Sequence, residues 1–364
     1  MRITFLLPPV NMSGGIRVIA IYAQALARRG HEIFLISPPP KPIPLRRRLK
    51  TFIRGKGWPR VRRALSHIDG LGLQHHVLSS HRPIGNEDVP DADVVIATWW
   101  ETAEWIQALS PSKGSKVYFI QGYEVFPYLP IDRVEQTYRS QMKKIVVARW
   151  LQEVMRTHYG DHDVVVVPNA VDHQQFHAPP RGRQVQPTVG FLYSEMPLKG
   201  VDVTLQVLDA LRKTYPELRA VGFGSSPPSG SLKLDSMIEL LISPPQDEIR
   251  NIYAQCDVWL STSRSEGFNL TAIEAMACRT PVVSTRTGWP AEALVNGWNG
   301  MLTEVDDIPG LVSGVESVLA LTDEAWRAMS DHALQTVASS SWDVSALMFE
   351  RALHFCRDHG TREV

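Results

Sequence analysis

The stretch SEGFNLTAIEAMAC, residues 265–278, is the most informative part of the sequence for the fold. A polar loop containing Gly267 leads into Leu270–Ala277, which has a helical pattern. The apolar run Val258–Ser261 comes before the loop, and Pro281–Thr285 follows the helix. Continuous apolar runs without polar alternation are typical of strands covered on both faces, as in parallel sheets. The stretch therefore predicts a strand–loop–helix–strand unit in an α/β protein.

The same alternation extends outward in both directions. The helical segments Ile16–Arg29 and Val201–Thr214 are expected to connect parallel strands. In the first half the predicted strands are Ile3–Leu7, Glu32–Ser37, Val94–Thr98, Val117–Gln121, Ile145–Ala148 and Val164–Val167. In the second half they are Thr188–Tyr193, Ala220–Gly224, Ile238–Ile242, Val258–Ser261 and Pro281–Thr285.

The pattern occurs twice, so the sequence predicts two doubly wound, Rossmann-like domains. A strand gives way to a polar, proline-containing stretch after Pro168-Asn169-Ala170-Val171-Asp172. We therefore expect domains over residues 1–170 and 171–340, with a last helix in 341–364 that packs back across the seam. Doubly wound sheets bind ligands at the carboxyl ends of their strands, so the two domains are expected to face each other across a ligand-binding cleft.

Composition narrows the class of protein. A chain of 364 residues is long enough for two cores, and 44% hydrophobic with 21% charged residues is ordinary for a globular protein. Equal numbers of basic and acidic residues, 38 each, speak against a nucleic-acid partner. The odd set Cys256, Cys278 and Cys356 favours reduced thiols and a cytoplasmic location. The apolar run at the start ends at Pro8-Pro9 without a cleavage site, and no run is long enough to span a membrane.

These motifs together resemble glycosyltransferase family 4, a retaining family with the GT-B fold. Residues 265–278 resemble its E-x7-E segment, and four further matches fall in the family's order. They are Ser13-Gly14-Gly15, Pro168-Asn169-Ala170-Val171-Asp172, Lys199-Gly200, and Gly288-Trp289-Pro290-Ala291-Glu292 with Asn296-Gly297-Trp298-Asn299-Gly300. The resemblance covers nearly the whole chain and is densest in the second half. It implies a nucleotide-sugar donor held by the second domain.

A nucleotide sugar presents a ribose diol, a diphosphate leaving group and a sugar. The N–H groups of Phe268, Asn269, Leu270 and Thr271, where loop becomes helix, are free to face an anion. By resemblance, Glu274 takes the ribose diol and Glu266 takes the donor sugar. Alternatively, Glu274 is an ordinary acid near the start of a helix.

Positive charge at the diphosphate is the next requirement, and by resemblance Lys199 contacts the distal phosphate. Alternatively, it is a solvated surface lysine. The sequence departs from the family pattern at Ser194, where an arginine is usual. Arg264 and Arg17 are the candidates to replace it. Gly224, at the end of a predicted strand, is a further candidate donor-binding residue.

The first domain offers two candidate segments. Gly14 and Gly15 allow backbone to approach a ligand closely, although a simple tight turn is the alternative. Gln121, Tyr123 and Glu124 follow the strand ending at Gln121, where many family members carry a histidine near the anomeric centre. One of the three could face the donor sugar instead, or Tyr123 and Glu124 could be structural.

The segment Lys41–Arg63 carries ten cations and no acid. Leu45, Leu49, Phe52, Ile53, Trp58 and Val61 lie among these cations. Such interleaving suits a membrane-surface element, so a lipid-linked or anionic acceptor and a peripheral position on the inner face of a membrane are expected. A solvated loop and a nucleic-acid patch remain alternatives.

The sequence thus predicts a retaining hexosyltransferase that needs no metal or cofactor, with a glycan, a lipid-linked molecule or another hydroxyl compound as acceptor. No histidine spacing suggests a metal site. Glu266, Lys199, Gln121, Tyr123 and Glu124 are the candidate catalytic residues. A nucleotide-sugar epimerase or hydrolase of the same fold, or an inactive nucleotide-sugar-binding protein, remains possible.

Overall fold

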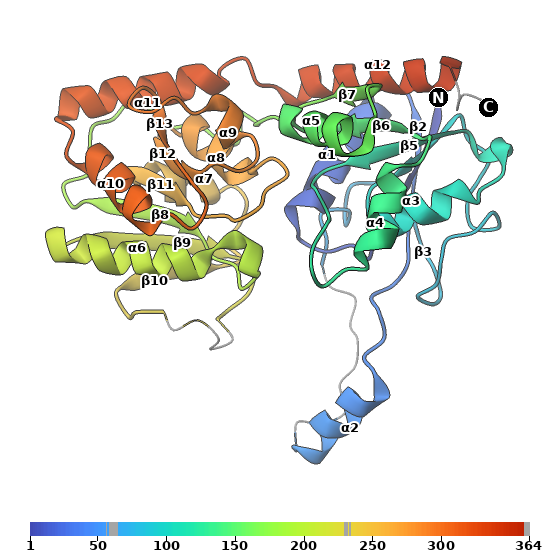
Figure 1. Ribbon diagram of the computed structural model, residues 1–364, viewed down its shortest axis with the longest axis horizontal. Helices are drawn as coiled ribbons and strands as arrows, with labels where there is room; N and C mark the ends of the chain where they lie inside the picture. Colours follow the sequence, from blue (N-terminus) through green and yellow to red (C-terminus); the bar gives the residue numbers. More distant parts are fainter. Residues whose placement is uncertain (56, 58–64, 229–231, 233, 360–364) are drawn as a thin grey trace. The chain divides into compact units, whose positions relative to one another are not determined.

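The computed structural model describes residues 1–55, 57, 65–228, 232 and 234–359. They form two compact units (Figure 1). The first comprises Met1–Val147, Leu151–Val167 and Ser345–Val364, and the second comprises Ala148–Trp150 and Pro168–Val344.

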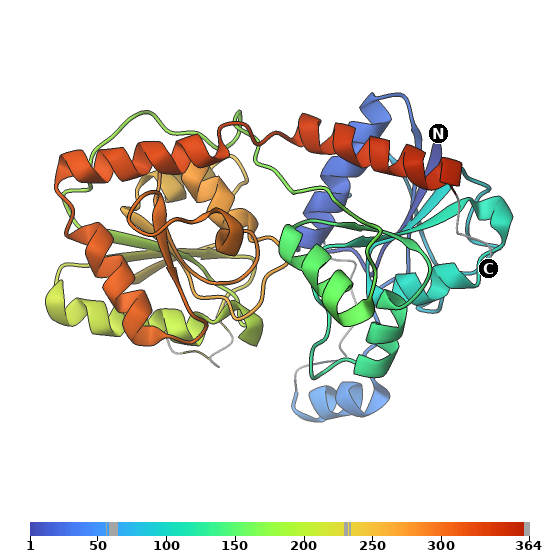
Figure 2. The same ribbon diagram turned by 45° about the horizontal axis from the view of Figure 1, so that its top comes forward.

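The first unit is built on a seven-stranded sheet with the order β3-β2-β1-β4-β5-β6-β7, in which every neighbouring pair is parallel. Its strands are β1 (Arg2–Leu6), β2 (Glu32–Ser37), β3 (Gln74–Val77), β4 (Val94–Ala97), β5 (Ser115–Ile120), β6 (Lys143–Val146) and β7 (Val164–Val166). Its helices are α1 (Gly14–Arg28), α2 (Leu45–Ile53), α3 (Trp100–Gln107), α4 (Ile131–Tyr138) and α5 (Arg149–Tyr159), with the 3-10 turn η1 (Pro111–Lys113). Figure 2 shows helices flanking the strands of each unit.

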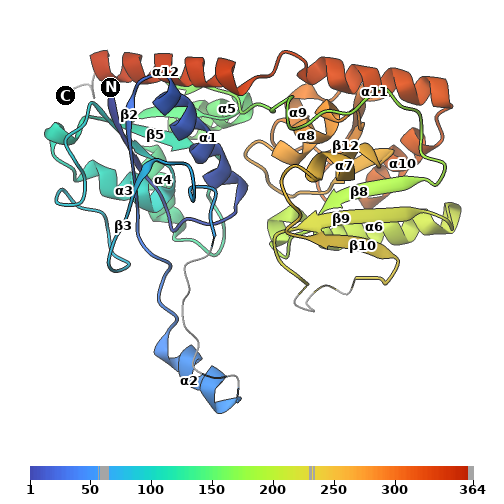
Figure 3. The same cartoon turned by 180° about the vertical axis from the view of Figure 1, so that it is seen from behind.

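The second unit has a six-stranded parallel sheet with the order β10-β9-β8-β11-β12-β13 (Figure 1). Figure 3 shows β8, β9, β10 and β12 of this sheet from behind. Its strands are β8 (Thr188–Leu192), β9 (Arg219–Gly224), β10 (Ile238–Ile242), β11 (Val258–Ser261), β12 (Val282–Thr285) and β13 (Gly300–Thr303). Its helices are α6 (Val201–Thr214), α7 (Ile249–Ala254), α8 (Leu270–Ala277), α9 (Pro290–Ala293), α10 (Ile308–Leu319) and α11 (Asp323–Val337), with the 3-10 turn η2 (Pro197–Lys199). Helix α6 packs beside α10, and α8 packs beside α7 and α11.

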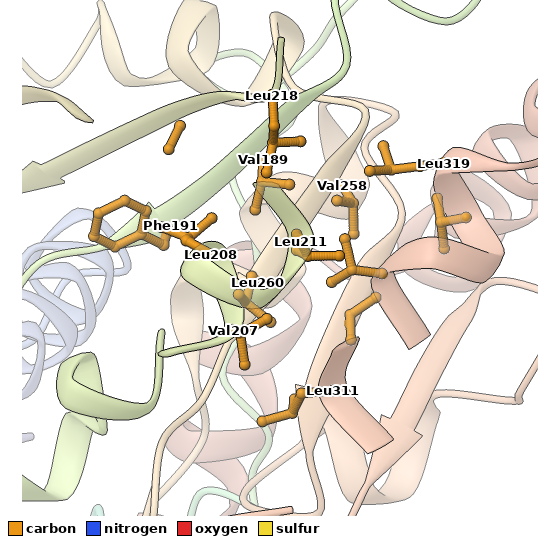
Figure 4. Close-up of a cluster of buried hydrophobic side chains, with 14 of the residues drawn as sticks. Val189, Phe191, Val207, Leu208, Leu211, Leu218, Val258, Leu260, Leu311 and Leu319 are labelled. Carbon is orange, nitrogen blue, oxygen red and sulfur yellow. The ribbon is translucent and has the colours of Figure 1, made fainter. Parts of the chain in front are cut away.

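The core of the second unit explains why its strands are apolar throughout. Phe191 of β8 and Leu260 of β11 lie among Leu208 and Leu211 of α6 and Leu311 of α10 (Figure 4). Each of these side chains is fully or almost fully buried. Burial of such a side chain stabilises the fold by roughly 1.5–3 kcal/mol, so this cluster holds the sheet and its edge loops in place.

The last helix, α12 (Trp342–His359), packs on the first unit, although its sequence follows the second. The ring of Phe349 lies 4.6 Å from that of Tyr22 in α1 and 5.0 Å from that of Phe119 in β5. Helix α12 therefore contributes to the core of the first unit, although more than a hundred residues of the second unit come between them in the sequence.

The predicted α/β class, with two Rossmann-like doubly wound units, is confirmed by these two parallel sheets and their flanking helices. The predicted strands are all present, and α6 and α8 have the predicted bounds. Two strands were missing from the prediction. Gln74–Val77 is polar and half exposed, and Gly300–Thr303 begins with a glycine, so neither has the continuous apolar run of a central strand. Both lie at sheet edges.

Candidate donor-binding site

The strand order of the second unit reverses between β8 and β11, because the chain moves outward from β8 to β9 and β10 and then returns beside β8. At such a reversal the loops after the two strands diverge, and doubly wound sheets bind ligands there. Lys199 lies in the loop after β8, and Glu266 lies in the loop after β11. Topology therefore places these two candidates at the expected binding edge.

Lys199 and Glu266 are in direct contact. The ammonium of Lys199 donates to both carboxylate oxygens of Glu266, at 2.7 and 2.9 Å. The hydroxyl of Ser263 donates to the same carboxylate at 2.7 Å. The side chain of Lys199 is 27% exposed and that of Glu266 is 10% exposed. An ammonium has three N–H donors, so Lys199 can keep Glu266 in place and still donate to a phosphate.

Gly200 allows the two loops to meet. It has a φ of +62°, and a Cβ at this position would lie 2.1 Å from the carbonyl oxygen of Thr262. That carbonyl belongs to the loop after β11, so only glycine lets η2 approach it. The Lys199-Gly200 pair is thus explained by geometry: glycine permits the approach, and lysine supplies the charge.

The amino end of α8 faces the same edge of the sheet. Asn269 caps the helix in a left-handed conformation, and its side-chain oxygen accepts from the N–H of Ala272. Its amide nitrogen donates to the hydroxyl of Ser261 at 2.8 Å. Within the described residues, the N–H groups of Leu270 and Thr271 have no hydrogen-bond partner. Such groups at a helix amino end favour an anion.

Glu274 lies one turn into α8 and is 3% exposed. Its carboxylate accepts a hydrogen bond of 2.9 Å from the hydroxyl of Tyr253 in α7. This bond fixes the orientation of the carboxylate. A carboxylate that accepts hydrogen bonds from the hydroxyls of a ligand needs such a fixed orientation.

The loop between Glu266 and Asn269 is held from the side by Gly288 and Trp289. The ring of Phe268 stacks on that of Trp289, with centroids 5.7 Å apart. Gly288 has a φ of +60°, and a Cβ there would lie 2.8 Å from the carbonyl oxygen of Phe268. The motif around Gly288 therefore supports the backbone of the loop that carries Glu266.

The remaining second-unit candidates lie at the same edge but are engaged by the protein. Arg264 makes two bonds to Asp202, one to Asp306 and one to the carbonyl oxygen of Pro197. Its charge is thus already neutralised. Gly224 ends β9, where a Cβ would lie 2.6 Å from the carbonyl oxygen of Tyr193. Arg17, the other candidate cation, belongs to α1 of the first unit.

The strand order of the first unit reverses between β1 and β4. Gly14 and Gly15 are the first two residues of α1, and they come directly after the loop that follows β1. A Cβ at Gly15 would lie 3.7 Å from the side-chain nitrogen of Gln121, which follows β5. The two candidate segments of this unit, distant in sequence, therefore meet at one edge of its sheet.

Tyr123 and Glu124 are held inside the first unit. The hydroxyls of Tyr123 and Tyr159 lie 2.9 Å apart. The carboxyl group of Glu124 accepts from the N–H of Trp100 at 2.9 Å and from the hydroxyl of Tyr118 at 3.3 Å. Burial raises the pKa of Glu124 to about 8, although these two bonds oppose the shift. Glu124 is therefore mostly protonated at neutral pH.

Sequence reasoning missed the residues that hold the candidates in position. Ser263 bonds to Glu266, Tyr253 bonds to Glu274, Ser261 bonds to Asn269, and Trp289 stacks on Phe268. Their types are common in any domain, so only spatial proximity identifies them. Of the four, only Trp289 lies in a motif that the resemblance had singled out.

Residues 186–320 match the family model described as glycosyl transferases group 1. A D-inositol 3-phosphate glycosyltransferase of Corynebacterium jeikeium is 32% identical over 180 residues, which cover 46% of this chain and 42% of that protein. The D-inositol 3-phosphate glycosyltransferase of Mycolicibacterium smegmatis is 32% identical over 181 residues, or 46% of this chain and 41% of that protein. The matched stretch thus spans less than half the length of these curated relatives.

Solved structures agree over the full length of the chain. Sucrose-phosphate synthase of Thermosynechococcus elongatus has a TM-score of 0.74 at 16% identity, covering 99% of this chain and all of that one. Anabaena HepE in complex with UDP and glucose has a TM-score of 0.74 at 17% identity, covering 97% and 99%. At such identities the likeness shows the fold alone. The resemblance predicted from the motifs is confirmed as a similarity: residues 186–320 match the group 1 glycosyltransferase model, and the chain has the GT-B fold of its solved structural neighbours.

Proposed function

We propose that this chain is a retaining hexosyltransferase that moves a sugar from a nucleotide-sugar donor to a hydroxyl acceptor without a metal ion. The observation that carries the proposal is the contact between Lys199 and Glu266 beside the amino end of α8. It brings a cation, a hydroxyl-accepting carboxylate and two unpartnered N–H groups to one edge of a sheet. HepE, whose structure holds UDP and glucose, shares this fold.

Each part has a role that follows from the chemistry of the donor. The bond from the sugar to the diphosphate breaks, and negative charge develops on the leaving oxygen. Lys199 and the N–H groups of Leu270 and Thr271 stabilise that charge, because preorganised donors act most strongly where charge develops. Glu266 accepts from hydroxyls of the transferred sugar, and Glu274 accepts from the ribose diol.

We assign the acceptor to the first unit, with Gln121 beside Gly15 as the side chain that contacts the reacting sugars. A lipid-linked acceptor is supported by α2, in which Arg46 and Lys50 alternate with exposed apolar residues and which is directly followed by Arg54. Leu45, Leu49, Phe52 and Ile53 are between 44% and 81% exposed. Cations near anionic lipid contribute about 1 kcal/mol each, and apolar side chains add burial in the interface. Some residues named for the predicted membrane segment lie outside the described residues: Lys56, Trp58, Arg60, Val61, Arg62 and Arg63. Of the helices that the structure describes, none is long and apolar enough to cross a bilayer.

The decisive experiment measures turnover of a panel of nucleotide sugars labelled in the sugar, with and without candidate acceptors. A transferase moves label to the acceptor and releases nucleoside diphosphate. A hydrolase releases free sugar without acceptor, an epimerase changes the sugar on the nucleotide, and an inactive binding protein does none of these. NMR of the product's anomeric proton tests retention, since an inverted configuration would contradict it.

A further inference from the structure

Two histidines and a glutamate come together on the first unit, away from the residues discussed so far. Glu350 and His354 are four residues apart on α12 and therefore share one face of the helix. His31 lies between α1 and β2. One ligand atom from each of the three lies within 4.8 Å of the other two, the only such group in the part of the chain that the structure describes.

The contacts within this group join α12 to the body of the first unit. The ring nitrogen Nε2 of His31 lies 2.7 Å from Oε1 of Glu350, and the rings of His31 and His354 are 6.2 Å apart. The side chain of His31 is 7% exposed and that of Glu350 is 15% exposed. This partial burial limits competition from water and strengthens electrostatic interactions.

We propose that His31, Glu350 and His354 form a site for a divalent transition metal of the zinc type. Two imidazoles and one carboxylate are a zinc ligand set, with water in the fourth position. Tetrahedral zinc with bonds of about 2.0–2.1 Å places its ligand atoms about 3.3 Å apart, so small side-chain movements would close the group around an ion. The ion replaces the contact between His31 and Glu350 and links α12 to the segment before β2.

The surrounding charges are compatible with this arrangement. Arg29 donates to Oε2 of Glu350, through Nε at 2.7 Å and Nη2 at 2.6 Å, and leaves Oε1 to face His31. It can therefore orient the carboxylate from outside the site, as partners of metal ligands commonly do. The amino group of Met1 lies 3.0 Å from Nδ1 of His31. With the metal on Nε2, Nδ1 of His31 stays outside the coordination of the ion and faces this amino group.

The test uses the full chain without an affinity tag, freed of metal by a chelator and then titrated with Zn²⁺ or Co²⁺ alone. The wild type should bind one equivalent, develop the visible absorption of tetrahedral Co²⁺, and melt at a higher temperature with metal. His354→Ala leaves the contacts among His31, Glu350 and Arg29 in place. It should nevertheless weaken metal binding by about 100-fold. Removing an outer-shell partner of a metal ligand costs up to about this much, and His354 is proposed as a direct ligand.

A matched control is His162→Ala, which removes an exposed histidine of the same unit and should bind like the wild type. If the wild type binds neither ion, or if His354→Ala binds as tightly as the wild type, the site does not exist. All three readouts are independent of sugar transfer, so their outcome does not depend on the proposed function.

Discussion

At the scale of single residues, the ammonium of Lys199 is the group on which the proposed chemistry depends most. Replacing Lys199 by alanine should lower turnover by two to three orders of magnitude, because losing one preorganised contact to developing charge typically costs about 2.7–4 kcal/mol. Steady-state kinetics with the preferred donor measure this. Lys213→Ala, which removes an exposed lysine from the last turn of α6, is the control and should behave as the wild type. Equal turnover in the two variants would show that Lys199 is a surface lysine without a role in catalysis.

Glu124 offers a second prediction at this scale, concerning stability and pH. Its pKa is raised by burial to about 8, far above that of an exposed glutamate. The folded state therefore keeps a proton that the unfolded state has lost, so stability is fully present below pH about 4.5 and falls as pH rises through 8. The contribution changes by up to about 1.4 kcal/mol per pH unit over this range.

Glu124→Gln tests this, because the amide resembles the protonated acid and cannot ionise. In calorimetric melts at pH 5 and pH 8, the glutamine variant should lose less stability than the wild type as pH rises. Glu124→Ala should be less stable at both values, since it empties a buried position and leaves the N–H of Trp100 unpaired. Parallel pH profiles for the wild type and Glu124→Gln would refute the buried, protonated carboxyl.

At the scale of elements, the loop leading into α8 is shaped by its neighbours as well as by its own sequence. Gly288→Ala should lower donor affinity, because the new Cβ would meet the carbonyl of Phe268 and displace the loop that carries Glu266. Gly297→Ala is the matched control: it also has positive φ, at +76°, but no atom lies within 4 Å of its Cβ position. Both should lose about 1–2 kcal/mol of stability. Donor titration by calorimetry should separate them, and equal affinities would mean that the loop does not depend on this support.

Helix α2 carries the prediction about membranes. The wild type should sediment with anionic vesicles at low salt and be released at high salt, because the Debye length shrinks from about 10 Å at 0.1 M to 3 Å at 1 M. Replacing Arg46, Arg47, Arg48 and Lys50 by serine should abolish binding while donor affinity stays unchanged. Replacing Leu45, Leu49 and Phe52 by serine should also weaken it, because charge alone does not hold a helix in the interface.

Two results would end the membrane proposal. If the wild type does not sediment with anionic vesicles at low salt, α2 is a solvated element or an acceptor contact. Binding that survives loss of the apolar residues would indicate electrostatic attraction alone.

At the scale of the whole molecule, the proposed sugar transfer needs no metal ion, whereas the proposed site in the first unit binds one. In the proposed mechanism, Lys199 and backbone N–H groups of the second unit stabilise the leaving group without a metal ion, so EDTA should leave turnover at moderate temperature unchanged. The proposed zinc-type site belongs to the first unit, so EDTA should lower only the melting temperature. Assays and melts on one preparation test both, and complete loss of turnover that Mg²⁺ or Mn²⁺ restores would overturn the metal-free mechanism.

The sequence by itself determined the class of the fold and the bounds of several elements. Apolar runs that continue without alternation predict doubly covered strands wherever they occur, and β2, β10, β11, α6 and α8 begin and end where the patterns do. These apolar patterns are local, because the face of a strand or helix on which a residue lies depends on its position relative to its neighbours in sequence. The strands β3 and β13 were not predicted because β3 is polar and half exposed and β13 begins with a glycine, so neither has a continuous apolar run. The motif of residues 265–278 likewise indicated the candidate donor-binding loop without any knowledge of its contacts.

Only the tertiary structure decided which of the candidates meet. Lys199 and Glu266 are 67 residues apart in sequence, and they touch because β8 and β11 are neighbours in the sheet. By sequence, Arg264 was a candidate to replace the arginine that is usual at Ser194, but in the structure Asp202 and Asp306 neutralise its charge. The contact between His31 and Glu350 spans 319 residues and exists because α12 packs on the first unit. Strand order and helix packing are collective results of core burial, so no local pattern contains them.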